Sequence, residues 1–150
     1  AGGAGSAIAH TVLGMGSTQL RIVDTDSKRA AALVAALNSR YGAGAVTMPN
    51  IAEALVDATG LIHATPTGMD KLPGLPLAIS LLRRSMWVSE VVYFPIETEL
   101  LKAARAAGCA TVNGGTMAIG QAVGAFELFT GLRADATRME QHFRRLLGTY

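Results

Sequence analysis

The chain has 150 residues, of which half are apolar and 16% are charged. This balance excludes a mainly disordered chain, and the length suits one domain with a sizeable core. The net charge of +2 is scattered and forms no basic stripe, so a nucleic-acid partner is not expected. The single cysteine, Cys109, excludes an internal disulfide framework and a CxxC zinc site, and it fits a reducing cytoplasm.

Two long stretches carry no charged residue, residues 1–20 and residues 106–126. The first lacks a basic start and is interrupted by glycines, so it does not fit a signal peptide. The second contains five glycines, Asn113 and Gln121, and is too polar for a membrane span. We therefore expect a cytoplasmic protein without a membrane partner.

Short apolar segments alternate with helical periodicity along the chain. The pattern predicts strands at 20–23, 45–48, 61–65, 87–93 and 111–112, separated by helices. Helices are predicted after the opening glycines, over 27–41, 51–58 and 77–84, after Pro95, over 119–126 up to Gly131, and from Asp135 onward. This alternation predicts an α/β fold with a Rossmann-type, doubly wound parallel sheet and extra C-terminal helices. The irregular segment 67–76 is expected to line a cleft.

The chain opens with a glycine-rich segment, residues 1–7, directly before a helical pattern. Small residues there let a backbone approach a diphosphate, and a helix N-terminus offers N–H donors. The next predicted strand ends at Asp24, nineteen residues after Gly5, a spacing typical of the carboxylate that binds adenosine ribose hydroxyls. A carboxylate favours NAD over NADP, although Lys28 and Arg29 could meet a 2′-phosphate. An S-adenosylmethionine-dependent methyltransferase and a tight turn without a ligand are alternatives.

A dinucleotide-binding fold needs a strand before its glycine loop, and this sequence starts inside the loop. We therefore expect the first, central strand to be absent from the sequence. The sequence would then be the rear part of a longer polypeptide, or upstream residues are not represented. A sheet without that strand would expose edges and apolar surface.

Three segments, residues 64–69, 91–101 and 117–123, occur in the order found in one family. With them the chain resembles the shikimate dehydrogenase family, most closely its NAD-using quinate/shikimate dehydrogenases. The resemblance extends over residues 1–150 but covers only the family's C-terminal cofactor half. It implies that 1–150 is a nicotinamide-dinucleotide-binding domain. It further implies hydride transfer between NAD, or NADP, and the ring hydroxyl or keto group of shikimate or quinate.

The resemblance also implies roles for individual residues. The positions implied to bind the cofactor are Gly3, Ala4, Asp24, Arg29, Ala64, Thr65, Pro66, Thr67, Val91, Gly114 and Met117. Tyr93 and Gln121 are implied to reach the substrate. The family's catalytic Lys and Asp lie in its N-terminal substrate domain, so we assign no catalytic residue to this chain. No metal ligands are assigned, the partner is a small-molecule substrate, and a homodimer is compatible with the resemblance.

Some residues depart from the family pattern or have a simpler interpretation. His63 stands where the family commonly has Asn, and it is expected to be a hydrogen-bonded structural histidine rather than a catalytic base. Cys109 is expected to be a small buried residue. Without the resemblance, Tyr93 would be a core residue and Gln121 a solvent-facing helix residue. A dehydrogenase-like domain kept as a non-catalytic sensor or regulator is a further alternative.

Overall fold

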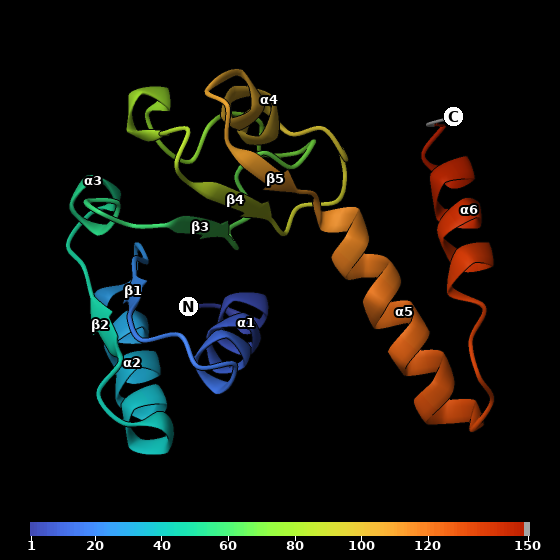
Figure 1. Cartoon of the computed structure of the whole chain (residues 1–150), viewed down its shortest axis with the longest axis horizontal. Helices are drawn as coiled ribbons and strands as arrows, with labels where there is room; N and C mark the ends of the chain where they lie inside the picture. Colours follow the sequence, from blue (N-terminus) through green and yellow to red (C-terminus); the bar gives the residue numbers. More distant parts are fainter. Residues whose placement is uncertain (149–150) are drawn as a thin grey trace.

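A computed structural model of the chain describes residues 1–148 and shows strands alternating with helices (Figure 1). The strands are β1(Leu20–Ile22), β2(Ala45–Thr47), β3(Gly60–His63), β4(Trp87–Glu90) and β5(Ala110–Val112). The helices are α1(Gly3–Gly14), α2(Ser27–Tyr41), α3(Ile51–Ala54), α4(Glu99–Ala106), α5(Gly114–Thr130) and α6(Ala136–Leu146), with one 3-10 turn, η1(Ile79–Leu81). The predicted α/β class and the predicted strand positions are confirmed, with each strand end within a few residues of its expected place.

The strands form two parallel sheets rather than one continuous sheet. β1 pairs with β2, and a second sheet has the order β3-β4-β5. Within residues 1–148, β1 and β3 each have one edge that no other strand covers. The interruption therefore lies between β1 and β3, where a doubly wound sheet has its central strand.

Each sheet has its own buried apolar cluster. Beside β1 and β2, helices α1 and α2 and strand β2 supply the cluster Ala9, Leu13, Leu33, Leu37 and Ala45. Beside the other sheet, the cluster is Leu55, Leu61, Leu77, Leu82, Met86, Val88, Leu100, Ala104 and Cys109. Cys109 is buried, as expected, and its thiol donates to the Arg83 carbonyl over 3.2 Å. Helices α1, α2 and α4 thus cover the sheets by burying one apolar stripe each.

Arg21 links the two sheets. From β1 its guanidinium donates to the carbonyl of Ala54, over 3.1 Å, and to that of Val56. Both carbonyls belong to the end of α3 and the turn that leads into β3. The two halves of the structure are therefore held together by polar contacts as well as by α1.

Side-chain caps fix where several helices begin. Asp26 accepts from the amides of Lys28 and Arg29 at the start of α2, and Asp135 caps α6 in the same way. Asn113 accepts from the Thr116 amide, so α5 begins at Gly114, earlier than the 119–126 pattern predicts. These oxygens satisfy backbone donors that lack a partner within the helix.

The predicted helix over 77–84 is wrong. Only the single turn η1 forms, and the backbone is extended at both Ala78 and Leu82. Leu77 and Leu82 are both buried in the same apolar cluster, and an extended backbone on each side of the turn lets them reach it. Burial of these two side chains therefore overrides the helical spacing.

Helices α5 and α6 extend away from the two sheets and run beside each other (Figure 1). They are the extra C-terminal helices that the sequence predicts. Over residues 1–148, no helix has both the length and the apolar character required to span a bilayer.

Candidate functional site

The start of α1 lies at the carboxyl ends of β1 and β3. The Ala1 nitrogen donates to Asp24, just past β1, over 2.6 Å. A Cβ placed on Gly5 would lie 3.5 Å from the Cβ of Ala64, just past β3. A crevice at the carboxyl ends of parallel strands, beside the interruption in the sheet, is where α/β folds of this kind bind ligands. We call this region, residues 2–6 with Asp24 and Ala64, the crevice.

Gly3 and Ala4 lie in the first turn of α1 rather than in a loop before it. The helix begins at Gly3 with Gly2 as its N-cap, and both Gly3 and Ala4 are exposed. The first amides of a helix have no acceptor within the helix, and their dipoles favour an anion. These two positions therefore present free donors without a bulky side chain beside them.

Asp24 is held in place by Arg29 and by backbone nitrogens. Arg29 donates to Oδ1 over 2.8 Å, the Asp26 amide donates to the same oxygen over 2.9 Å, and the Ala1 nitrogen lies 2.6 Å from Oδ2. The Arg29 side chain, together with the Asp26 amide, holds the pKa of Asp24 well below its ordinary value. Asp24 is thus a carboxylate at neutral pH, and Arg29 forms an ion pair with it.

The 64–68 loop follows β3 and contains four of the predicted cofactor positions. Thr65 and Pro66 are exposed, and the Thr65 hydroxyl accepts from the Thr67 amide over 3.3 Å. Gly68 has φ +94°, a conformation that favours glycine, and it lies against Thr98. The chain beyond the loop lines a cavity of about 200 Å³ together with Glu97, Glu99 and Lys102, as expected of segment 67–76.

The remaining predicted positions gather where β4 ends and α5 begins. A Cβ on Gly114 would lie 2.4 Å from the Val92 carbonyl oxygen and 2.5 Å from that of Val91. Tyr93 is 50% exposed and its ring centroid is 6.5 Å from that of Phe143 in α6. The core interpretation of Tyr93 is therefore wrong.

Helix α5 carries the last two positions. Met117 is half-buried in its first turns, and Gln121 is exposed one turn further on. The structure thus brings the predicted binding residues together in two groups. One group lies around the crevice and the 64–68 loop, and the other lies around the start of α5.

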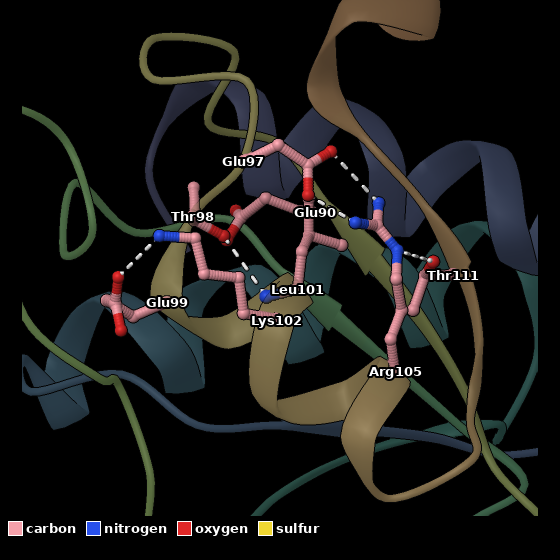
Figure 2. A network of polar contacts seen from close by, with 8 residues as sticks. All are labelled: Glu90, Glu97, Thr98, Glu99, Leu101, Lys102, Arg105 and Thr111. Carbon is pink, nitrogen blue, oxygen red and sulfur yellow. Dashed lines mark hydrogen bonds and ion pairs between the residues drawn. The ribbon is translucent and has the colours of Figure 1, made fainter.

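Sequence reasoning missed a buried carboxylate, Glu90, at the end of β4. Its side chain contacts His63 and Thr98, and all three residues are at most 5% exposed. Figure 2 shows Glu90 beside Thr98. The structure confirms His63 as a hydrogen-bonded structural residue. A glutamate inside the apolar segment 87–92 was the available signal, because an ionisable residue in a buried strand is rarely without a partner.

Comparison with known proteins shows which family the chain is similar to. Residues 114–142 match the family described as "Shikimate 5'-dehydrogenase C-terminal domain". The chain is 51% identical, over 99% of its length, to a shikimate dehydrogenase (NADP(+)) of Streptomyces avermitilis, of which it covers 52%. It is 46% identical, over 97% of its length, to a quinate/shikimate dehydrogenase (NAD(+)) of Corynebacterium glutamicum, of which it covers 53%. The chain matches the C-terminal half of the shikimate dehydrogenase family. The resemblance inferred from the sequence motifs is thereby confirmed for that half.

Solved structures of this family share the fold. Quinate dehydrogenase from Corynebacterium glutamicum, in complex with NAD, superposes with a TM-score of 0.90 at 45% identity, over 97% of this chain and 52% of that one. Shikimate 5-dehydrogenase from Listeria monocytogenes, in complex with shikimate and NAD, superposes with a TM-score of 0.84 at 28% identity, over 95% of this chain and 53% of that one. These matches confirm the Rossmann-type fold. The chain spans about half the length of the curated relatives it matches.

The arrangement can bind and orient a ligand with both anionic and hydroxyl groups. The crevice offers helix amides for an anion and a carboxylate for hydroxyl donors. In residues 1–148 no group of three His, Cys, Asp or Glu side chains gathers in a way that could hold a metal ion. Helix amides and a carboxylate are the groups that suit the diphosphate and the ribose hydroxyls of a dinucleotide.

Proposed function

We propose that this chain is the nicotinamide-dinucleotide-binding domain of an oxidoreductase. The reaction is hydride transfer between NAD, or NADP, and the ring hydroxyl or keto group of a shikimate- or quinate-class substrate. The relatives named for these activities support the proposal, and the chain aligns with their C-terminal halves.

The convergence of α1, Asp24 and Ala64 carries the proposal. A dinucleotide needs donors for its diphosphate and an acceptor for its ribose hydroxyls, about 20 residues apart in sequence. Gly3 and Ala4 supply the first and Asp24 supplies the second, and Gly5 in the same turn of α1 approaches Ala64 at the end of β3. The residues present therefore fit the cofactor.

Asp24 supports a preference for NAD over NADP. Its carboxylate accepts hydrogen bonds from ribose hydroxyls, and it repels the 2′-phosphate that distinguishes NADP. Arg29 is committed to Asp24 over 2.8 Å, so it is not free to meet that phosphate without breaking an ion pair. NADP remains the alternative cofactor, since Lys28 lies exposed next to Arg29.

The bound dinucleotide would accept or donate the hydride. In this chain Ala64, Thr65, Pro66 and Thr67 would border its nicotinamide half, with Val91, Gly114 and Met117 around the nicotinamide ring. Tyr93 and Gln121 would reach the substrate with a hydroxyl and an amide. The proton that leaves the alcohol needs an acid/base group, and we place that group in the second half that the relatives possess. We further propose a cytoplasmic protein whose partner is a small-molecule substrate, with a homodimer as one assembly.

A binding titration tests the cofactor assignment. We expect NAD⁺ to bind the complete polypeptide, as encoded, more tightly than NADP⁺, and S-adenosylmethionine not to bind. Asp24→Asn should weaken NAD⁺ binding by about tenfold, because an acceptor for the ribose hydroxyls loses its charge. The matched control is Asp70→Asn, which changes an exposed aspartate in the segment beyond the 64–68 loop.

Turnover tests the reaction. The complete polypeptide should oxidise shikimate or quinate with NAD⁺. Binding of S-adenosylmethionine without either dinucleotide would reject the proposal in favour of a methyltransferase. Dinucleotide binding without any oxidation of either substrate would instead indicate a sensor or regulatory domain.

A further inference from the structure

A buried polar chain leads from the core of the β3-β4-β5 sheet to the 64–68 loop. His63 and Glu90 are register partners on adjacent parallel strands, and His63 Nδ1 lies 2.9 Å from Glu90 Oε1. His63 Nε2 lies 2.6 Å from the Thr65 hydroxyl oxygen. His63 and Glu90 are 5% and 1% exposed, whereas Thr65 is exposed. One histidine thus connects a buried carboxylate to a loop at the surface.

Glu90 is surrounded by donors. Oε1 also accepts from the Val92 amide over 3.0 Å, and Oε2 accepts from the Thr98 hydroxyl over 3.0 Å (Figure 2). A buried carboxylate is tolerated when its oxygens are hydrogen-bonded in this way. The carboxylate in turn holds His63 in one orientation.

The donors around Glu90 indicate one direction for each hydrogen bond. With Glu90 Oε1 as an acceptor, Nδ1 of His63 donates to it, and in the neutral tautomer Nε2 is then an acceptor. In that tautomer the Thr65 hydroxyl donates to Nε2, one of its lone pairs accepts from the Thr67 amide, and a second lone pair is left. Thr65 is left as an acceptor toward the side of the loop that faces solvent.

The same carboxylate also supports the other end of the loop. Thr98, which donates to Glu90, lies against Gly68, where a Cβ would be 3.7 Å from the Thr98 Cβ. Thr98 is 1% exposed and also caps α4 by accepting from the Leu101 amide over 3.3 Å. Glu90 therefore holds the start of the loop through His63 and its end through Thr98.

We propose that His63 is a positioning residue for dinucleotide binding, which acts by holding the Thr65 hydroxyl and with it the 64–68 loop, and that Glu90 fixes the orientation of His63. The inference rests on the proposed function, since the loop is one of the segments assigned to the cofactor. His63 itself is buried and acts through Thr65. Loss of the His63–Thr65 contact should weaken cofactor binding and leave the chemical step unchanged.

The test is a double-mutant cycle in the complete polypeptide, with NAD⁺ as the probe. Thr65→Val removes the hydroxyl, and His63→Asn keeps a donor for Glu90 but is too short to reach Thr65. Each variant should raise the Kd and the KM for NAD⁺ about 5- to 10-fold, the value of one lost hydrogen bond. The double variant should bind no more weakly than either single variant. Thr65→Ser, which retains the hydroxyl, should restore the parental Kd.

The matched control is Thr111→Val. It removes another threonine hydroxyl, which accepts from Arg105 Nε over 3.1 Å in β5 and lies apart from the loop (Figure 2). Its Kd should equal that of the parent. If His63 has only a structural role, its substitution lowers the thermal unfolding midpoint without changing the KM for NAD⁺. Both quantities are therefore measured on every variant.

Three outcomes would overturn the inference. If Thr65→Val binds NAD⁺ as tightly as the parent, the hydroxyl plays no part in binding. If the effects of the two single variants multiply in the double variant, His63 does not act through Thr65. If the parent binds neither NAD⁺ nor NADP⁺, the proposed function fails and this inference fails with it.

Discussion

Gly114 occupies a position where a side chain has no room. It is the first residue of α5, and a Cβ there would lie 2.4 Å and 2.5 Å from the carbonyl oxygens of Val92 and Val91. Both obstacles are backbone atoms at the end of β4, so they cannot rotate away. Gly120, in the same helix, would place a Cβ in open space. Close approach of two carbonyl oxygens therefore requires glycine at Gly114, whereas nothing in the surroundings of Gly120 does.

This contrast gives a matched pair of variants. Gly114→Ala should lower the free energy of unfolding by about 1–3 kcal/mol, because the backbone must shift to admit the methyl group. Gly120→Ala should raise it by about 0.5–1 kcal/mol, because alanine has less entropy to lose in a helix. Urea unfolding of both variants measures the difference. Equal values for the two would contradict the close packing of α5 against the end of β4.

The surroundings of individual residues were predictable where they depend on local sequence. Asp24 lies just past β1, as its spacing predicts, while its role in binding stays a prediction. His63 was expected to be hydrogen-bonded, as its contact with Glu90 confirms. Glu90 was missed because its partners come from residues 27 positions earlier and 8 positions later in the chain. Their meeting depends on the register of β3 against β4, and a single sequence does not specify which residues of two strands lie opposite each other.

Among the elements, strands and capped helices were predicted well. Each strand is a short apolar segment, and Asp26 and Asp135 are caps that can be recognised from sequence. The helix predicted over 77–84 failed because the buried cluster, rather than local propensity, decides the path there. The segment after η1 is held by Arg83, whose guanidinium donates to the carbonyls of Leu55 and Ala58 over 2.9 Å and 3.0 Å.

Arg83, which lies in the segment after η1, therefore stabilises the turn between α3 and β3 through these two hydrogen bonds. Arg83→Gln should lower the free energy of unfolding by about 1.5–3 kcal/mol, because two carbonyls lose a charged donor in a partly buried place. The control is its exposed neighbour, and Arg84→Gln should change the value by less than about 0.5 kcal/mol. Urea unfolding and amide exchange of residues 55–58 provide the measurements. If Arg84→Gln lowers the free energy of unfolding as much as Arg83→Gln does, the Arg83 contacts have no specific role.

At the scale of the whole molecule, two sheets with separate cores meet at the crevice. Arg21 on one side and the Gly5–Ala64 approach on the other bring the sheets together without a shared strand ladder. The alternation of strands and helices predicted parallel strands, and the glycine loop without a preceding strand predicted an absent central strand, but the division into two sheets with separate cores was not predicted. Side-chain periodicity did not predict how far α5 and α6 extend from the sheets, because their apolar residues look like core residues in the sequence (Figure 1).

Because α5 extends away from the sheets, its far end exposes apolar side chains. Leu128 and Phe129 are 80% and 84% exposed, and Leu132 in the following turn is also exposed. Clustered apolar side chains on a surface bind hydrophobic dyes and promote association. The 150-residue chain should therefore enhance the fluorescence of such a dye, and a double variant with Leu128→Ser and Phe129→Ser should reduce this enhancement. Because neither side chain is buried, the unfolding midpoint should change little, which separates loss of a surface patch from loss of structure. Unchanged dye fluorescence in the double variant would mean that these side chains are covered in solution.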